Sequence, residues 1–219
     1  MILAISKEDI LKQLILQLEA HFLLSDNERA LISHYFESAL QVCEENFVNN
    51  SNKYYYEMKD GNKIAKFNPY HSVQYMMFLY TLSHILYVNK EAPLLCDKIY
   101  YLNKILNSVD ILYAVELPKH FHADHPLGSV MGRARYGEGF VFLQGCTVGG
   151  TRDKDGNLFY PVIEENVTMF SNSSILGRCH IGKNVNIGAG CIVKNQDVPD
   201  NSTVFGESPN LIIKQKKNG

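Results

Sequence analysis

Three features are missing from this sequence, and each absence excludes a class of protein. The formal net charge is only -2, so there is no excess of lysine and arginine of the kind that binds nucleic acid. No apolar run approaches the ~20 residues that a membrane-spanning helix needs. The cysteines are odd in number and include no Cys-x-x-Cys pair, which predicts reduced, buried thiols rather than a disulfide framework; they stand at positions 43, 96, 146, 179 and 191.

The rest of the composition is that of an ordinary globular protein. The chain has 219 residues, of which 46% are hydrophobic and 20% charged, enough to bury one or two cores. Its N-terminal stretch turns acidic and amphipathic after six residues, unlike a cleaved signal sequence. We therefore expect a cytoplasmic protein that does not bind nucleic acid and has no membrane span.

Residues 1–115 have the apolar spacing of helices, with one interruption. Ser6 begins a capping pattern ahead of a first amphipathic helix, and Ser25 or Asp26 can cap a second one. Asp60-Gly61 lies between two potential strands and predicts a small β-hairpin, after which two more helical stretches follow. One of them carries an aromatic and aliphatic stripe that we interpret as core rather than as a cofactor site: Tyr75, Phe78, Leu79 and Leu82.

The second half of the sequence follows a different period. From residue 163 onward an aliphatic residue recurs at every sixth position, and a small or β-branched residue follows four positions later. This is the hexapeptide repeat of a parallel β-helix, in which three six-residue strands form one triangular coil. We expect the aliphatic residues to point into the prism and the small ones to pack near its corners. The aliphatic positions are Ile163, Met169, Ile175, Ile181, Ile187 and Val193, and the small positions are Val167, Ser173, Cys179, Val185 and Cys191.

The same frame extends backwards through Val148, Phe142, Tyr136 and Val130. The segment "GTRDKDGNLFYP" interrupts it, and we interpret this segment as a loop extruded from the coil. The segment "GRCHIGKN" resembles a phosphate-binding loop, but it ends in asparagine where a hydroxyl is needed and falls within the repeat, which argues against nucleotide hydrolysis. His180, within that segment, is expected to be solvated.

The stretch "HFHADH" allows two chemical interpretations. Its histidines, His120, His122 and His125, have a spacing that could bind Zn²⁺, as in β-helix enzymes resembling γ-class carbonic anhydrase. Those enzymes, however, gather histidines from more than one coil, whereas these three lie within six residues. A general base fits better, because an imidazole titrates near neutrality and His125 has Asp124 beside it and Glu116 a short segment upstream. A plain turn before Pro126 is the third possibility.

From "DHPLGSVMGRARYGEGFVFLQGCTVGG" through "YPVIEENVTMFSNSSILGRCHIGKNVNIGAGCIVKNQDVP" the chain resembles serine O-acetyltransferases. The resemblance implies an α+β fold, with a helical N-terminal domain over residues 1–115 and a left-handed parallel β-helix acyltransferase domain with a C-terminal cap over 116–219. It implies acetyl-CoA as co-substrate, no metal, and direct acetyl transfer to a hydroxyl. By resemblance His125 is the catalytic base and Asp124 the aspartate before it. Glu116 matches the family's histidine-pairing aspartate, with a segment six residues shorter between them.

The chain departs from the family at the extruded loop. Where the family has Arg-His-Pro, basic residues that hold the amino-acid acceptor, this chain has Phe159-Tyr160-Pro161. Arg133 and Arg135 stand where the family carries an acidic or neutral pair. We therefore predict that an arginine contacts an anionic acceptor, with Tyr160 nearby. The acceptor is serine-like or, preferentially, a sugar of a surface-polysaccharide pathway.

The resemblance also implies where the co-substrate binds and how the chain assembles. CoA lies along the edge of the β-helix between two subunits of a trimer, and the matching positions here are Gly150, Ser171, Ala189 and Lys194. A homotrimer or a dimer of trimers is expected. Three other functions stay open: N-acetylation of an amino sugar, a γ-carbonic-anhydrase-like metal enzyme, and a non-catalytic β-helix scaffold.

Overall fold

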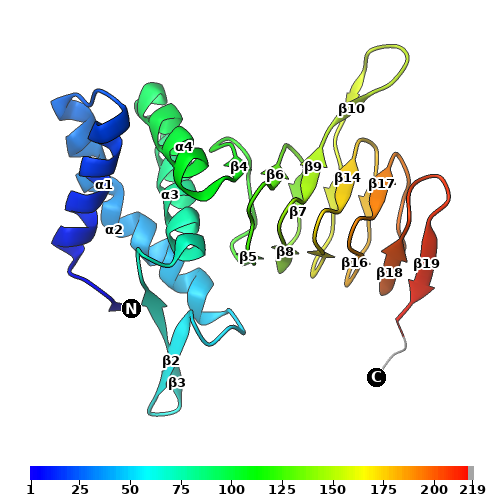
Figure 1. Ribbon diagram of the computed structural model, residues 1–219, viewed down its shortest axis with the longest axis horizontal. Coiled ribbons are helices and arrows are strands. Elements are labelled where there is room, and N and C mark those ends of the chain that lie inside the picture. Colours follow the sequence, from blue (N-terminus) through cyan, green and yellow to red (C-terminus); the bar gives the residue numbers. More distant parts are fainter. Residues whose placement is uncertain (217–219) are drawn as a thin grey trace. The chain divides into compact units, whose positions relative to one another are not determined.

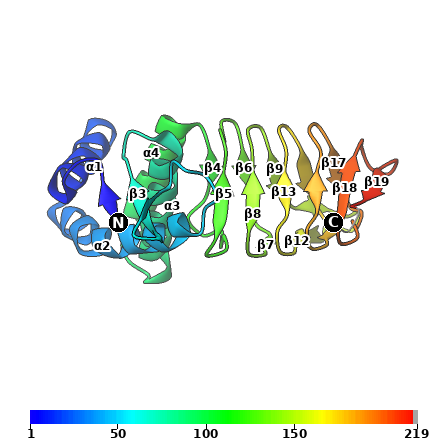
Figure 2. The ribbon, with the colours of Figure 1, turned by 90° about the horizontal axis from the view of Figure 1, so that it is seen from below.

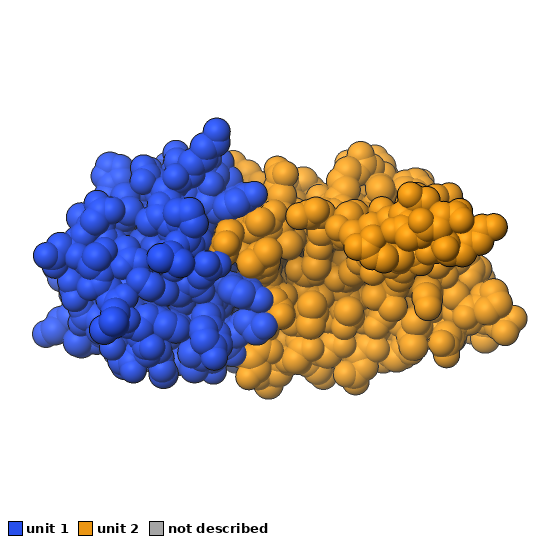
Figure 3. Space-filling model, turned by 90° about the horizontal axis from the view of Figure 1, so that it is seen from above, with its two compact units in different colours: residues 1–107 blue, residues 108–219 orange. Residues whose placement is uncertain are grey.

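The computed structural model describes residues 1–216 and divides into two compact units, residues 1–107 and the chain from Ser108 onward (Figure 3). The sequence predicts this boundary after residue 115. The second unit starts earlier because Asp110–Ile111 (β4) pair in parallel with Val130–Met131 (β6), as a strand of the β-helix does. In residues 1–216, no helix has the length and apolar character needed to cross a membrane.

The first unit combines helices with a small sheet. In chain order it comprises β1 (Ile2–Leu3), α1 (Lys7–His21), α2 (Asp26–Val48), β2 (Tyr56–Lys59), β3 (Asn62–Phe67), α3 (Ser72–Val88) and α4 (Pro93–Asn107). Asp60 and Gly61 join β2 to β3 with positive φ angles of 50° and 77°, the backbone that a two-residue hairpin turn requires. The predicted hairpin is confirmed. The stripe on α3 is core, as predicted: Tyr75, Phe78, Leu79 and Leu82 are each 3% exposed or less.

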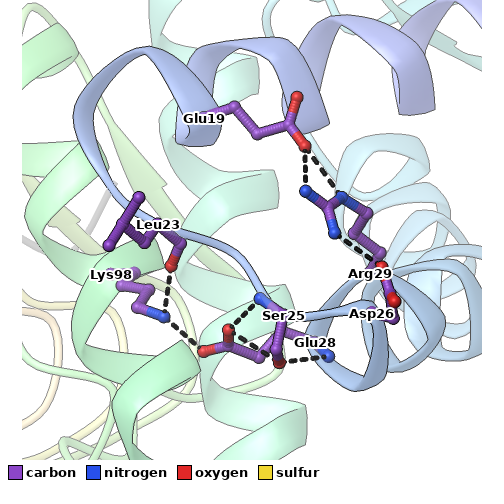
Figure 4. A network of polar contacts seen from close by, with 7 residues as sticks. All are labelled: Glu19, Leu23, Ser25, Asp26, Glu28, Arg29 and Lys98. Carbon is purple, nitrogen blue, oxygen red and sulfur yellow. Dashed lines mark hydrogen bonds and ion pairs between the residues drawn. The ribbon is translucent and has the colours of Figure 1, made fainter.

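Serine caps begin α1 and α2. The Ser6 hydroxyl accepts the N–H of Asp9 at 3.1 Å, and Ser25 forms a reciprocal capping box with Glu28. Glu28 also accepts from the Lys98 ammonium of α4 at 2.5 Å, so one carboxylate links a helix start to a second helix (Figure 4). Burial alone would raise the pKa of Glu28, but the hydrogen bonds from Lys98 and Ser25 outweigh it and hold this pKa below its usual value.

The second unit is a parallel β-helix with three faces (Figure 1). The first face is β7, β12 and β15; the second is β5, β8, β13, β16 and β18, followed by β19; the third is β4, β6, β9, β14 and β17. Figure 2 shows second-face strands of successive coils side by side. Beyond β4 and β6, the bounds are β5 (Phe121–Ala123), β7 (Arg135–Tyr136), β8 (Phe140–Phe142), β9 (Thr147–Gly149), β12 (Val162–Ile163), β13 (Thr168–Met169), β14 (Ser174–Leu176), β15 (His180–Ile181), β16 (Asn186–Ile187), β17 (Ile192–Lys194), β18 (Ser202–Phe205) and β19 (Ile212–Gln215).

The interior of the prism follows the six-residue period. All six aliphatic positions from Ile163 to Val193 are 0% exposed, and the small positions between them are 3% exposed or less. Parallel pairing stacks like on like: Ile175 lies between Val148 and Val193. Burial raises the pKa of the Cys191 thiol, at one of the small positions, to about 11, so this thiol stays protonated and unreactive near neutrality. The repeat interpretation is confirmed.

The backward extension of the frame fails at its last step. Val148, Phe142 and Tyr136 are buried as predicted, but Val130 is 39% exposed and Met131 points inward in its place. Met131 pairs with Val148, 17 positions later, whereas Ile175 and Val193 are 18 positions apart. The coil is one residue short, and a one-residue slip reverses which side chains face the core.

Asparagines form the corner between the first and second faces. Asn166, Asn184 and Asn201 have φ angles of 57°, 55° and 53°, in the left-handed region that asparagine tolerates better than most residues. Their side-chain amides form a ladder along the stack: Asn166 donates to Asn184 at 3.1 Å, and Asn184 donates to Asn201 at 2.9 Å. The corner therefore satisfies its own polar groups from coil to coil.

One coil extrudes the predicted loop. Thr151–Arg152 (β10) pair antiparallel with Leu158–Phe159 (β11), and this hairpin projects from the stack in Figure 1. The loop starts where the third face ends and returns to the first face at Val162. The chain then closes with an antiparallel hairpin, β18 with β19, at the far end of the β-helix.

Candidate active site

His125 lies in the turn between the second and third faces, directly after β5. Its φ is +48°, an uncommon conformation for a residue with a side chain, and its side chain is 83% exposed. The Asp124 carboxylate lies 3.7 Å from its Nε2, and the Asp124 N–H donates to the carbonyl of Phe142 on the next coil at 3.0 Å. The backbone therefore fixes the turn, while the imidazole points to solvent with a carboxylate beside it.

Two of the predicted co-substrate residues lie at the same corner, which we call the His125 corner. There the carbonyls of Leu127, Gln144 and Ser171 each accept an N–H from the next coil, at 2.9, 2.8 and 2.9 Å. The N–H group that Ser171 accepts belongs to Gly190, the residue after Ala189. Because hydrogen-bonded strands lie about 4.8 Å apart, Ser171 is roughly 10 Å along the stack from the His125 turn.

Gly150 and Lys194 lie at the opposite end of the third face, which we call the loop corner. Lys194 pairs with Leu176, and Leu176 pairs with Gly149, the residue before Gly150. The Lys194 side chain is exposed, and its N–H donates to the Ser208 hydroxyl at 3.0 Å. The four predicted residues therefore flank one face of the prism rather than forming a single pocket.

Glu116 lies away from His125. It is exposed and lines a groove of about 620 Å³ beside the first face, with neighbours that include Lys119, Arg135 and Glu138. In residues 1–216, the carboxylate within ion-pair distance of His125 is that of Asp124. The structure thus brings His125 and Asp124 together and places Glu116 elsewhere.

Arg135 is already engaged. Its guanidinium forms an ion pair with Glu164, whose Oε1 also lies 3.0 Å from His180 Nε2. The hydrogen bond from His180 and the charge of Arg135 hold the pKa of Glu164 below its usual value. Arg135 therefore has a carboxylate partner on its own face, and His180, expected to be solvated, has one too.

Arg133 contacts the loop instead. Its guanidinium carbon lies 5.4 Å from the centroid of the Tyr160 ring, within the range of a cation–π contact. The Tyr160 ring rests on Gly150, where an added Cβ would lie 2.9 Å from two ring carbons. Three predicted residues, Arg133, Gly150 and Tyr160, thus form one contact set at the loop corner.

The other two histidines of "HFHADH" face different surroundings. His120 Nδ1 lies 3.0 Å from Glu138, which also accepts the N–H groups of Lys119 and His120 at 3.1 and 3.0 Å. His122 lies on β5 and pairs in register with Val141. Across residues 1–216, no three His, Cys, Asp or Glu side chains gather in a way that could hold a metal ion.

Asp110 was not among the predicted site residues. It is half-buried on β4, in register with Val130, and its N–H donates to the Ser129 carbonyl at 2.9 Å. Ser129 ends the turn that carries His125, so β4 brings Asp110 to the coil beside that turn. Spacing alone gave no clear signal, because Asp110 precedes His125 by 15 positions, whereas a regular coil such as that from Ile175 to Val193 takes 18.

The chain is similar in sequence to known hexapeptide-repeat transferases. The family model for the bacterial transferase hexapeptide (six repeats) matches residues 160–195. The serine acetyltransferase of Synechococcus elongatus is 34% identical over 126 residues, 57% of this chain and 50% of that protein. The serine acetyltransferase of Staphylococcus xylosus is 34% identical over 135 residues, 61% of each chain. This chain thus spans about half to three fifths of the length of these curated relatives.

Solved structures show the same fold. A serine acetyltransferase from Neisseria gonorrhoeae superimposes with a TM-score of 0.66 at 22% identity, covering 87% of this chain and 72% of that one. A serine acetyltransferase in complex with CoA gives a TM-score of 0.63 at 22% identity, covering 85% and 75%. The predicted fold, a helical N-terminal domain followed by a left-handed parallel β-helix, is confirmed, as is the resemblance to this family of hexapeptide-repeat proteins.

Proposed function

We propose that this chain, a hexapeptide-repeat protein whose β-helix is similar to that of serine acetyltransferases, is an acetyl-CoA-dependent O-acetyltransferase of the cytoplasm. The observation that carries the proposal is His125. Its φ of +48° is an uncommon backbone conformation for a residue that is neither glycine nor asparagine, and such strain also occurs at functional sites. Here it directs an 83% exposed imidazole outward beside a carboxylate, at a corner shared with Ser171 and Ala189.

In the proposed reaction the free imidazole nitrogen of His125 accepts the proton of the acceptor hydroxyl. The hydroxyl oxygen attacks the thioester carbonyl, the carbon–sulfur bond breaks, and the CoA thiolate leaves and takes up a proton. Asp124, at 3.7 Å from Nε2, stabilises the imidazolium that forms. A backbone N–H of a neighbouring coil serves as the oxyanion donor.

CoA is proposed to lie along the third face, between the His125 corner and the loop corner. Ser171 and Ala189 have small side chains, so the pantetheine arm can approach the backbone there, while Lys194 faces a phosphate. A serine acetyltransferase has been solved with CoA bound, which supports a CoA site on this fold.

For the acceptor, we favour a sugar hydroxyl over serine. The basic pair with which the family clamps the serine carboxylate is replaced here by Phe159 and Tyr160. Of the two arginines that the sequence offered, Arg135 is paired with Glu164, so Arg133 is the better candidate for an acceptor contact. A homotrimer or a dimer of trimers would bring the His125 corner of one subunit to the loop of another.

A thiol-release assay tests the function. We expect free CoA to appear from acetyl-CoA with sialic-acid-like or nucleotide-sugar acceptors faster than with L-serine, because the serine clamp is absent. Faster release with serine would make this a serine acetyltransferase with a divergent loop, and release with amino sugars alone would indicate N-acetylation. No release with any acceptor would leave the scaffold hypothesis standing.

Besides Asp124, two carboxylates are candidates for orienting His125: Asp110 by its place in the fold, and Glu116 by the family resemblance. We expect Asp110→Asn to lower kcat/KM about tenfold, because β4 holds Asp110 beside the His125 turn, whereas Glu116→Gln stays within twofold of wild type. Both substitutions are nearly isosteric, so kcat/KM from thiol release compares them directly. The opposite ranking would return Glu116 to the catalytic role that the family resemblance implied.

A further inference from the structure

The base of the extruded loop lies between arginines from two different coils. Arg178 follows β14 on the next coil, and its guanidinium carbon lies 3.7 Å from the centroid of the Phe159 ring. Arg133, on the preceding coil, lies 5.4 Å from the Tyr160 ring. Two backbone hydrogen bonds of 2.8 Å place the loop base between these coils. The Gly132 N–H donates to the Val148 carbonyl, and the Gly177 N–H donates to the Gly149 carbonyl.

The loop base itself is held in place. Its strands pair Thr151 with Phe159, and the Thr151 hydroxyl donates to the Asn195 side chain at 3.0 Å. The Tyr160 ring lies against the backbone of Gly150, so the ring has a fixed platform. A guanidinium stacked on such a platform keeps its N–H edge free while losing little conformational entropy on binding.

In the described part of the chain, the N–H groups of these two arginines are not taken up by a carboxylate. Within residues 1–216 no ion pair includes Arg133 or Arg178, in contrast to Arg135, which pairs with Glu164. Arg152, on the loop, differs again, because it donates to the Gly156 carbonyl at 2.7 Å. Asp153 is an acidic residue that interacts electrostatically with Arg178, but only weakly. Its pKa is lowered mainly by the hydrogen bond from Asn157, and least by the charge of Arg178.

We infer that Arg133 and Arg178 form a binding site for an anionic group, a carboxylate or a phosphate, at the loop corner. The inference deepens the proposed function, on which it rests for the identity of the ligand: the anion belongs to the acceptor or to CoA. Planar guanidinium edges suit both groups, because each offers two oxygens to parallel N–H donors.

Isothermal titration calorimetry tests the site with CoA, pantetheine, pyrophosphate and a sialic acid as probes. We expect Arg133→Gln and Arg178→Gln each to weaken binding of the anionic probes about tenfold and to leave pantetheine unchanged. Loss confined to CoA and pyrophosphate assigns the anion to CoA phosphates. Loss confined to the sialic acid assigns it to an acceptor carboxylate. Arg152→Gln, which removes an exposed arginine of the same loop, is the matched control and should stay within twofold of wild type.

Two further variants separate binding from folding. Arg133→Lys and Arg178→Lys keep the charge but lose the planar guanidinium group, and should weaken binding about threefold with unchanged circular dichroism. Anion affinities within twofold of wild type in both glutamine variants would overturn the site, as would a wild-type protein that binds none of the three anionic probes. Arginine-dependent binding without any thiol release would reject the acetyltransferase function and support the anion site. Thiol release without arginine-dependent binding would support the acetyltransferase function and reject the anion site.

Discussion

Replacing His125 with alanine should lower kcat/KM for acetyl transfer by about 10²–10⁴-fold, the usual contribution of a positioned general base. The side chain is 83% exposed and packs against no core, so the substitution should leave the fold intact. Because the side chain is not buried, a change in rate would not reflect a change in packing. Initial rates of CoA release at varied acceptor concentration measure the change, and circular dichroism checks the fold.

His180→Ala is the matched control for this experiment. His180 is also an exposed histidine of the β-helix, but it lies on β15 of the first face and contacts Glu164. Its loss should leave kcat/KM within twofold of wild type. If both variants kept wild-type rates, His125 would not be the base, and the exposed imidazole with its strained φ would need another explanation.

Replacing Ile175 with alanine should lower the free energy of unfolding by about 2–5 kcal/mol, the range for a large-to-small change in a packed core. Ile175 is 0% exposed and stacks between Val148 and Val193, so the cavity would open toward two neighbouring coils. Because a solenoid is stabilised by contacts between adjacent repeats, the damage reaches both of these interfaces. Urea titration followed by circular dichroism gives the shift in midpoint.

Ser174→Ala, one residue earlier on the same strand, provides the comparison. Ser174 is half-buried and points away from the prism, so its loss should cost no more than about 0.5 kcal/mol. A cost below 1 kcal/mol for Ile175→Ala, or equal costs for the two variants, would contradict the inward and outward assignment that the six-residue period predicts.

The interior of the β-helix could be predicted from sequence because one stacking rule repeats in every coil. Each inward position from Ile163 to Val193 needs an aliphatic side chain, so a local pattern reports a global arrangement. The rule breaks where a coil changes length. Val130 was assigned inward because the frame was carried through a coil that is one residue short, and no local signal marks that loss.

The candidate site was harder to predict, because its residues meet through stacking rather than along the chain. His125 and Asp124 are neighbours in sequence and were found together. Asp110 reaches the same region through the pairing of β4 with β6, and Glu116, although nearer in sequence, lies in a groove beside another face. The contacts of Arg133 with Tyr160 and of Arg178 with Phe159 join separate coils, and nothing in the sequence specifies them.

The coil that extrudes the loop has a consequence for how this protein could acquire a new substrate. Its paired residues Val148 and Ile175 lie 27 positions apart, against 18 for Ile175 and Val193, yet both pairs keep the same parallel register. The extra residues leave at one corner and return without disturbing the coils on either side. The residues beyond the paired strands β10 and β11 can therefore change in length and composition, through mutation or design, without loss of the coil contacts that hold His125. Selection for a different acceptor would act on this segment without lowering the stability of the prism.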